Sequence, residues 1–377
     1  MYRFLRSLLF LLPAETAHHL GIRVLSVLGV FVGICRRLRT RILERVARTA
    51  DGVSLRTRIG PLELEHPLML AAGLDKDARA VHGLFALGFS AVEIGTVTPR
   101  PQPGNPLPRL FRLPEHEALI NRMGFNNEGA LAAANRLRAL SWRPGPVGGN
   151  IGKNKATPIE HAMDDYLLCV DELGPVVDYV VVNASSPNTP GLRTLQEPEA
   201  LEQLLLAVRS RMDLVARGKP LLLKIAPDLG PEAVDAIVEV ALRCRIDGLI
   251  ATNTTITRPV DDPRASEAGG LSGRPMAALA TSVIARARVK AGDRLPIIGV
   301  GGIVDAQEAY RKIRAGASAV QLYTGFIYGG PGTVRRMLPE LAALLKKDGF
   351  SAVEDAVGVD AQAIVEREVH RREANDG

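Results

Sequence analysis

The residues of this chain best suited to chemistry gather in one short loop. The apolar run Tyr179–Val182 ends abruptly in Asn183-Ala184-Ser185-Ser186-Pro187-Asn188, which is typical of a buried strand that leads into a loop. In parallel sheets and barrels, the loops at this end of the strands carry the catalytic residues. Serine, asparagine and proline also form turns for purely local reasons, so the loop indicates a site only if other strands end in similar clusters.

The elements that must position these residues form a regular alternation. Short apolar segments alternate with helix-like stretches along most of the chain. This pattern predicts an α/β fold, a (β/α)8 TIM barrel, with a doubly wound open sheet as the alternative. The predicted strands are Pro67–Leu70, Ala91–Ile94, Val147–Ile151, Tyr179–Val182, Leu221–Ile225, Gly248–Ala251, Ile297–Val300 and Ala319–Leu322, and the clearest helices are Glu199–Val215, Glu232–Cys244, Ala277–Ala291 and Ala306–Ala315.

The ends of these strands indicate a flat, polar, anionic ligand at the barrel mouth. Small residues and a cation follow the first strand in Ala71–Lys76, and small residues let a planar ligand approach the backbone. Paired glycines follow the seventh strand, where barrels often bind a phosphate. These features favour a phosphorylated flat cofactor such as FMN. Amides, hydroxyls and a second lysine end the other strands: Thr96, Asn150, Lys224, Thr252, Asn253, Thr254 and Thr324.

Composition and charge narrow the class of protein. Hydrophobic residues at 46% and charged residues at 23% predict a folded globular protein. Cys35, Cys169 and Cys244 are too far apart for a disulfide framework, and no His/Cys/carboxylate cluster predicts a metal, so we expect a reducing compartment. The net charge of +6 is concentrated in residues 1–50, which hold nine arginines and two glutamates. A basic head on a near-neutral body favours an anionic membrane surface over nucleic acid.

The basic head also contains two apolar segments. Phe4–Leu12 and Val24–Ile34 are both shorter than the ~20 residues that span a bilayer. Arg3 and Arg6 before the first segment would also suit a signal peptide, but no small-x-small cleavage site follows. We therefore expect two helices at the membrane interface, with a signal peptide or ordinary core helices as alternatives.

Taken together, these motifs resemble those of the class 2, quinone-dependent dihydroorotate dehydrogenases over residues 1–345. In that family, dihydroorotate is oxidised to orotate with FMN, and membrane quinone reoxidises the flavin, which is a step of de novo pyrimidine biosynthesis. Any one motif would be weak evidence, but together they are specific. They are Ala71–Asp77, Glu93–Pro99, Asn121–Asn127, Asn150–Lys155, Asn183–Arg193, Ala251–Thr255, Gly269–Pro275 and Ile297–Ile303.

The resemblance implies a role for each matching residue. Ser186 matches the catalytic base, and Asn188–Leu195 the loop that closes over the substrate. Arg112, Tyr323 and His18 match the quinone site. The substrate residues implied are Lys76, Asn121, Arg122, Met123, Gly124, Phe125, Asn183, Asn188, Asn253 and Thr254. The FMN residues implied are Ala72, Gly73, Leu74, Asp75, Lys76, Thr96, Asn150, Asn183, Lys224, Thr252, Gly273, Gly302, Tyr323 and Thr324.

The resemblance also implies an organisation and a location. Residues 1–45 would form a helical membrane and quinone-access region, 46–345 the FMN-binding barrel, and 346–377 a charged tail that is helical or disordered. We expect a monomer at the cytoplasmic side of a bacterial cell inner membrane, bound peripherally, without transit peptide or spanning helix. The alternatives are another FMN-dependent barrel oxidoreductase, although no strand end offers the histidine base of a hydroxy-acid oxidase, and a non-enzymatic, membrane-docked barrel that binds a phosphorylated ligand.

Overall fold

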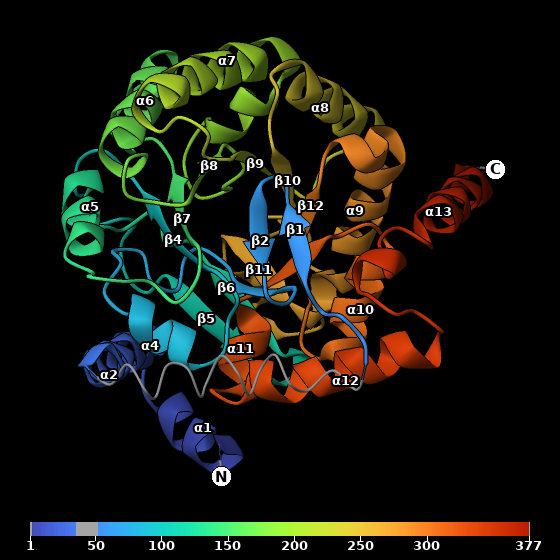
Figure 1. Ribbon diagram of the computed structural model, residues 1–377, viewed down its shortest axis with the longest axis horizontal. Helices are drawn as coiled ribbons and strands as arrows, with labels where there is room; N and C mark the ends of the chain where they lie inside the picture. The colour runs from blue at the N-terminus through green and yellow to red at the C-terminus, as the bar shows by residue number, and fades with distance from the viewer. Residues whose placement is uncertain (1, 35–51, 377) are drawn as a thin grey trace.

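The computed structural model describes residues 2–34 and 52–376, so Cys35 and the expected boundary at residues 45 and 46 lie outside the described residues. Eight parallel strands close into a barrel, which confirms the predicted (β/α)8 fold (Figure 1). Every predicted strand is present. They are β3 (Leu68–Leu70), β4 (Val92–Val97), β7 (Val147–Ile151), β8 (Tyr179–Asn183), β9 (Leu221–Ile225), β10 (Gly248–Ala251), β12 (Ile297–Val300) and β13 (Ala319–Leu322).

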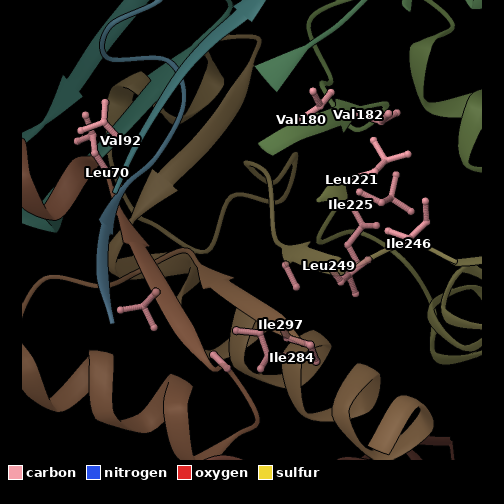
Figure 2. Close-up of a cluster of buried hydrophobic side chains, with 14 of the residues drawn as sticks. Leu70, Val92, Val180, Val182, Leu221, Ile225, Ile246, Leu249, Ile284 and Ile297 are labelled. Atoms are coloured by element: carbon pink, nitrogen blue, oxygen red, sulfur yellow. The ribbon is translucent and has the colours of Figure 1, made fainter. Parts of the chain in front are cut away.

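Helices surround this barrel, as Figure 1 shows. Side chains alternate along each strand, so the strands contribute to two buried clusters. Val180, Val182, Leu249 and Ile297 belong to the cluster that includes Ile284 of the surrounding helices (Figure 2). The helices are α4 (Val81–Ala86), α5 (Ala130–Arg138), α6 (Ala162–Leu173), α7 (Pro198–Val215), α8 (Pro231–Arg243), α9 (Ala277–Ala291), α10 (Ala306–Arg314) and α12 (Thr333–Lys347).

A second cluster fills the barrel and is completed by a hairpin. Met69, Val181 and Ile298 of the barrel strands pack with Ile59 and Leu62. Ile59 and Leu62 come from the antiparallel pair β1 (Thr57–Ile59) and β2 (Leu62–Leu64), which crosses the barrel in Figure 1. The sequence did not predict this hairpin, because three-residue strands are too short to show a periodic pattern.

Strand β4 extends further than predicted. Gly95, Thr96 and Val97 belong to the strand, whereas the predicted strand ended at Ile94, with these residues as its polar end. Pairing with β7 shifts register between Gly95 and Val97. Such irregularities re-aim side chains near active sites. Thr96 accordingly lines a cavity at the end of the barrel.

A small antiparallel sheet, also unpredicted, lies beside that cavity. It consists of β5 (Leu110–Leu113), β6 (Ala118–Asn121) and β11 (Gly270–Gly273). Asn121 and Gly273, at opposite ends of their paired segments, both line the cavity. The sheet therefore extends the barrel mouth with residues from two distant parts of the chain.

The N-terminal head forms two helices, α1 (Tyr2–Leu11) and α2 (Ala14–Ile34). The Tyr2 hydroxyl donates to the Ile327 carbonyl at 2.6 Å, which ties α1 to α11 (Thr324–Gly329). Helix α2 packs on α4, where a Cβ on Gly83 would lie 2.0 Å from the Leu25 carbonyl oxygen. In the described ranges, no helix is long and apolar enough to cross a membrane.

The tail beyond α12 is ordered and partly buried. It ends in α13 (Ala361–Asp376), which packs against α9. Val353 and Val365 join the main hydrophobic cluster. Arg314 of α10 pairs with Asp360 at 2.6 Å just before α13. Of the two predicted states of the tail, helix and disorder, the structure shows the helix.

Candidate active site

The cavity at the barrel mouth brings together most of the residues that the sequence singled out. It lies at the carboxyl ends of the barrel strands, where the loops of a (β/α)8 barrel form the active site. The predicted residues that line it are Ala72, Gly73, Lys76, Thr96, Asn121, Met123, Gly124, Phe125, Asn183, Ser186, Asn188, Lys224, Thr252, Asn253, Thr254, Gly273, Gly302, Tyr323 and Thr324.

Two lysines supply positive charge to this cavity. Lys224 at the end of β9 is 5% exposed, and burial lowers its pKa while the Glu93 carboxylate opposes the shift. Desolvation lowers the pKa of Lys76 to about 8, with Asp77 and Glu15 opposing it. Within residues 2–34 and 52–376, no group forms a hydrogen bond or ion pair with either ammonium. An anionic ligand in the cavity would compensate both charges.

A hydrogen-bond network fixes the amides beneath the cavity. Asn183 donates from Nδ2 to Thr96 Oγ1 at 2.8 Å and to Asn150 Oδ1 at 3.1 Å. Asn150 in turn donates to Glu93 at 2.8 Å, and Gln321 donates to the same carboxylate at 2.6 Å. Asn150 therefore does not line the cavity itself but holds the lining residue Asn183 by a hydrogen bond. The sequence analysis missed Glu93 and Gln321 as functional residues, although a polar side chain inside an apolar strand was a usable signal.

The loop after β8 holds Ser186 at the cavity. Its hydroxyl oxygen accepts the backbone N–H of Asn188 at 3.2 Å. Asn188 donates from Nδ2 to Asn121 Oδ1 at 3.3 Å, which links the loop to β6. Ser185 donates to Asn183 Oδ1 at 2.9 Å and accepts from Asn253 Nδ2 at 2.9 Å. Amides from three different segments therefore hold the loop that carries Ser186, a residue that is 5% exposed.

Glycines expose the backbone at the opposite side of the cavity. Gly302 has φ +76°, and a Cβ there would lie 2.4 Å from Ala277 Cα. Gly273 has φ +103°, and a Cβ there would lie 2.2 Å from the Glu117 carbonyl oxygen. Only glycine combines this conformation with such close packing. Gly302 follows β12, where barrels often bind phosphate, and Gly273 at the end of β11 lines the same cavity.

Besides Asn150, three predicted substrate or FMN residues lie around the cavity without lining it. The Asp75 carboxylate accepts the backbone N–H groups of Arg79 and Ala80 at 2.8 and 2.7 Å, so it fixes the loop before α4. Leu74 is buried in the main hydrophobic cluster. Arg122 pairs with Glu267 at 2.7 Å. These residues shape the loops that carry the lining residues.

The three expected quinone residues lie between the head and the barrel. Arg112 donates to the Phe10 and Leu12 carbonyls at 3.2 and 2.9 Å, at the end of α1. His18 lies on α2, where desolvation and then Lys76 and His19 lower its pKa to about 3. Tyr323 lines the cavity itself, and a Cβ on Gly73 would lie 3.2 Å from its ring. Helix α2 therefore approaches the cavity from the side of Lys76 and Tyr323.

An ion pair that the sequence analysis did not find fixes α2 there. Arg109 Nη2 lies 2.6 Å from Glu15 Oε1, and the two side chains are 10% and 13% exposed. Arg109 also donates to the Asn105 carbonyl at 2.8 Å. The two partners are 94 residues apart, and nothing in either local sequence indicates the pairing.

Known proteins resemble this chain in sequence and fold. The family described as dihydroorotate dehydrogenase matches residues 54–345. A dihydroorotate dehydrogenase (quinone) of Myxococcus xanthus is 62% identical over 360 residues, which is 96% of this chain and 98% of the relative. That of Acidithiobacillus ferrooxidans is 51% identical and covers 96% and 99%. A crystal structure of Eimeria tenella DHODH in complex with ferulenol superposes with a TM-score of 0.78 at 39% identity, over 85% of this chain and 94% of that one.

Proposed function

Because the chain belongs to the quinone-dependent dihydroorotate dehydrogenases, which oxidise dihydroorotate to orotate in pyrimidine biosynthesis, we propose that its barrel-mouth cavity holds both FMN and the substrate. One observation carries this proposal. Two lysine ammonium groups that form no hydrogen bond or ion pair with the described residues line the same cavity as the Ser186 hydroxyl. This arrangement provides a proton-accepting atom together with positive charge for anionic ligands.

The residues around the cavity fit FMN. Gly301 and Gly302 line the cavity after β12, and a side chain at Gly302 would clash with Ala277, so this loop presents backbone N–H groups that can hold a phosphate. Lys224 offers a buried cation to an electron-rich ring, and Thr96 and Asn183 offer fixed polar groups to the ring edge. When bound, FMN supplies the acceptor for the hydride that leaves dihydroorotate.

The residues of the chain handle the proton. Oxidation of dihydroorotate removes a proton from one carbon and a hydride from its neighbour. Ser186 Oγ is the proposed proton acceptor, and the N–H of Asn188 directs a hydrogen bond to this oxygen at 3.2 Å. A free serine is a weak base, so its surroundings must stabilise the charge that develops during the transfer. Asn121, Asn188 and Asn253 line the cavity and would hold the polar edge of the substrate.

The head supports a separate approach for quinone and the membrane. Large apolar side chains of α1 and α2 are exposed, including Phe4 at 74%, Leu11 at 82% and Phe31 at 66%. A helical surface of this kind binds the interface of a bilayer. We propose that residues 1–45 bind an anionic membrane at the cytoplasmic side of the bacterial inner membrane. Quinone would reach the flavin between these helices, past His18, Arg112 and Tyr323.

Two further expectations are part of the same proposal. Residues 46–345 would form the FMN-binding unit, and the protein would act as a monomer.

The test uses the visible spectrum of the purified protein and replacement of the proposed base. Dihydroorotate should bleach the flavin absorbance of the parent protein. Ser186→Ala should slow this reduction by about 10²–10⁴-fold, which is the usual contribution of a positioned base, and retain the flavin. Ser266→Ala, an exposed hydroxyl away from the cavity, is the control and should reduce at the parent rate. Parent-like reduction in Ser186→Ala would refute the assignment.

A further inference from the structure

One arginine joins three neighbouring loops, two of which carry residues that line the cavity. Arg193 lies in η3 (Leu192–Gln196), shortly after the loop of Ser186. Its Nε donates to the Ser185 carbonyl at 3.1 Å, and its Nη2 donates to the Thr254 carbonyl at 3.2 Å. Its Nη1 lies 3.0 Å from the Asp228 carboxylate. These three acceptors follow β8, β10 and β9 respectively.

The carboxylate of Asp228 extends this clamp. It is 10% exposed and accepts the Thr255 hydroxyl and the backbone N–H of Ile256 at 3.2 Å. Close by, Gln196 Oε1 accepts the N–H of Ala226 at 3.0 Å. The chain from Arg193 to Gln196 is thus fixed to its neighbours. Movement of the expected closing loop, residues 188–195, is therefore confined to the part before Arg193.

We propose that Arg193 and Asp228 are positioning residues for proton transfer to Ser186, an inference that rests on the proposed role of that serine. Neither side chain lines the cavity, so both act through the loops. The Ser185 carbonyl belongs to the peptide bond that enters Ser186, and the Thr254 carbonyl follows the substrate-facing Asn253. Because one planar group holds both carbonyls, it fixes the proposed proton acceptor, Ser186, relative to the Asn253 amide that faces the substrate.

The side chain at this position must be arginine for a geometric reason. A guanidinium has five N–H donors in a rigid plane and can bond three separated acceptors at once. A lysine ammonium keeps the charge but cannot reproduce this planar geometry. A displacement of about 1 Å at a reacting group can reduce the rate by about 10²-fold, so loss of the planar group should slow the chemistry.

The experiment compares variants of the flavin-loaded protein by stopped-flow reduction at saturating dihydroorotate. Arg193→Met should slow reduction by about 10–100-fold, with a larger effect on kcat than on KM. Arg193→Lys should recover only part of the rate. The control is Arg286→Met, because Arg286 forms a similar pair with Asp235 on the outer helices, with the two side chains 28% and 22% exposed. It should reduce at the parent rate.

A second background separates positioning from general damage. In Ser186→Ala, the route through the serine is absent, so adding Arg193→Met should change the remaining rate by no more than about twofold. If Arg193→Met fails to fold, Arg193→Lys and the isosteric Asp228→Asn provide the test, and both should reduce more slowly than the parent. Flavin content and thermal unfolding are measured for every variant.

Four results would overturn the inference. They are a parent-like rate in Arg193→Met, an equal loss in Arg286→Met, full recovery in Arg193→Lys, or the same fold-loss when Ser186 is already alanine. Failure of the proposed base gives a different result, because Ser186→Ala alone would then reduce like the parent whatever the Arg193 variants do.

Discussion

The ion pair between α2 and the barrel predicts that a single isosteric change, Glu15→Gln, will loosen the head. Two N–H groups of Arg109 donate to the Glu15 carboxylate, from Nη2 at 2.6 Å and from Nε at 3.0 Å. Hydrogen bonds to charged groups contribute about 1.5–3 kcal/mol when they are shielded from water. The glutamine keeps one acceptor but loses the charge, so we expect α2 to lose about 2–3 kcal/mol of docking free energy.

That loss corresponds to about a 30–150-fold increase in the undocked population of α2. Hydrogen exchange of the α2 amides measures this population directly, because local opening exposes them to solvent. The control is Glu202→Gln, which removes a more exposed pair with Arg243, whose side chains are 35% and 52% exposed. Such pairs contribute less than about 1 kcal/mol, so exchange of α2 should remain unchanged in that variant. Parent-like exchange of α2 in Glu15→Gln would refute the reasoning.

The same pair predicts a pH dependence of docking. Burial raises the pKa of Glu15, but the hydrogen bond and charge of Arg109 outweigh this and leave the pKa below its ordinary value. A carboxyl group with a depressed pKa in the docked state contributes its full stability above its ordinary pKa. That contribution is lost as the pH falls through the lowered value. The protection of the α2 amides, measured relative to their intrinsic exchange rate at each pH, should therefore fall in acid in the parent and vary less with pH in Glu15→Gln.

Three further expectations concern the cations around the site. Lys224→Ala should lose flavin or lower the reduction potential of the flavin, because a buried positive charge is removed. The control is Lys219→Ala, just before the other end of β9, which should retain the flavin and its reduction potential. Orotate binding should weaken as the pH rises through about 8, where Lys76 loses its proton, and calorimetry of Lys76→Gln should show a flat profile. Arg112→Ala should slow flavin reoxidation by long-tailed quinone but leave flavin reduction by dihydroorotate unchanged in stopped-flow traces. Equal losses in the rates of reoxidation and reduction would count against a separate quinone path.

The barrel could be predicted because its signals are local. Each buried strand is a short apolar run that ends in polar or glycine residues, and both halves of that pattern lie within ten residues of each other in Tyr179–Asn188. The polar ends then converge, because parallel strands in a closed barrel all present their carboxyl ends to one face. This convergence explains why Lys76, Ser186 and Lys224, far apart in sequence, line a single cavity.

The remaining features depend on pairings that no local pattern shows. Strands β5, β6 and β11 are four residues long, and β6 pairs with β11 across about 150 residues of chain. The Glu15–Arg109 pair and the Arg193–Asp228 clamp likewise join residues from separate elements. Charged residues are common in loops, so the sequence alone does not indicate that one of them forms an ion pair. Only the fold shows which charged group is its partner.

The position of α2 connects the two halves of the reaction. Glu15 on this helix raises the pKa of Lys76, while Arg109, the partner of Glu15, lowers it. Lys76 itself lines the cavity, and its pKa depends in part on whether the helix is docked. Deleting the head would therefore remove the proposed membrane contact and also change the electrostatics of the cavity. For this reason Arg112→Ala, which leaves Glu15 and Arg109 in place, separates the quinone step from the dihydroorotate step more cleanly than a truncation.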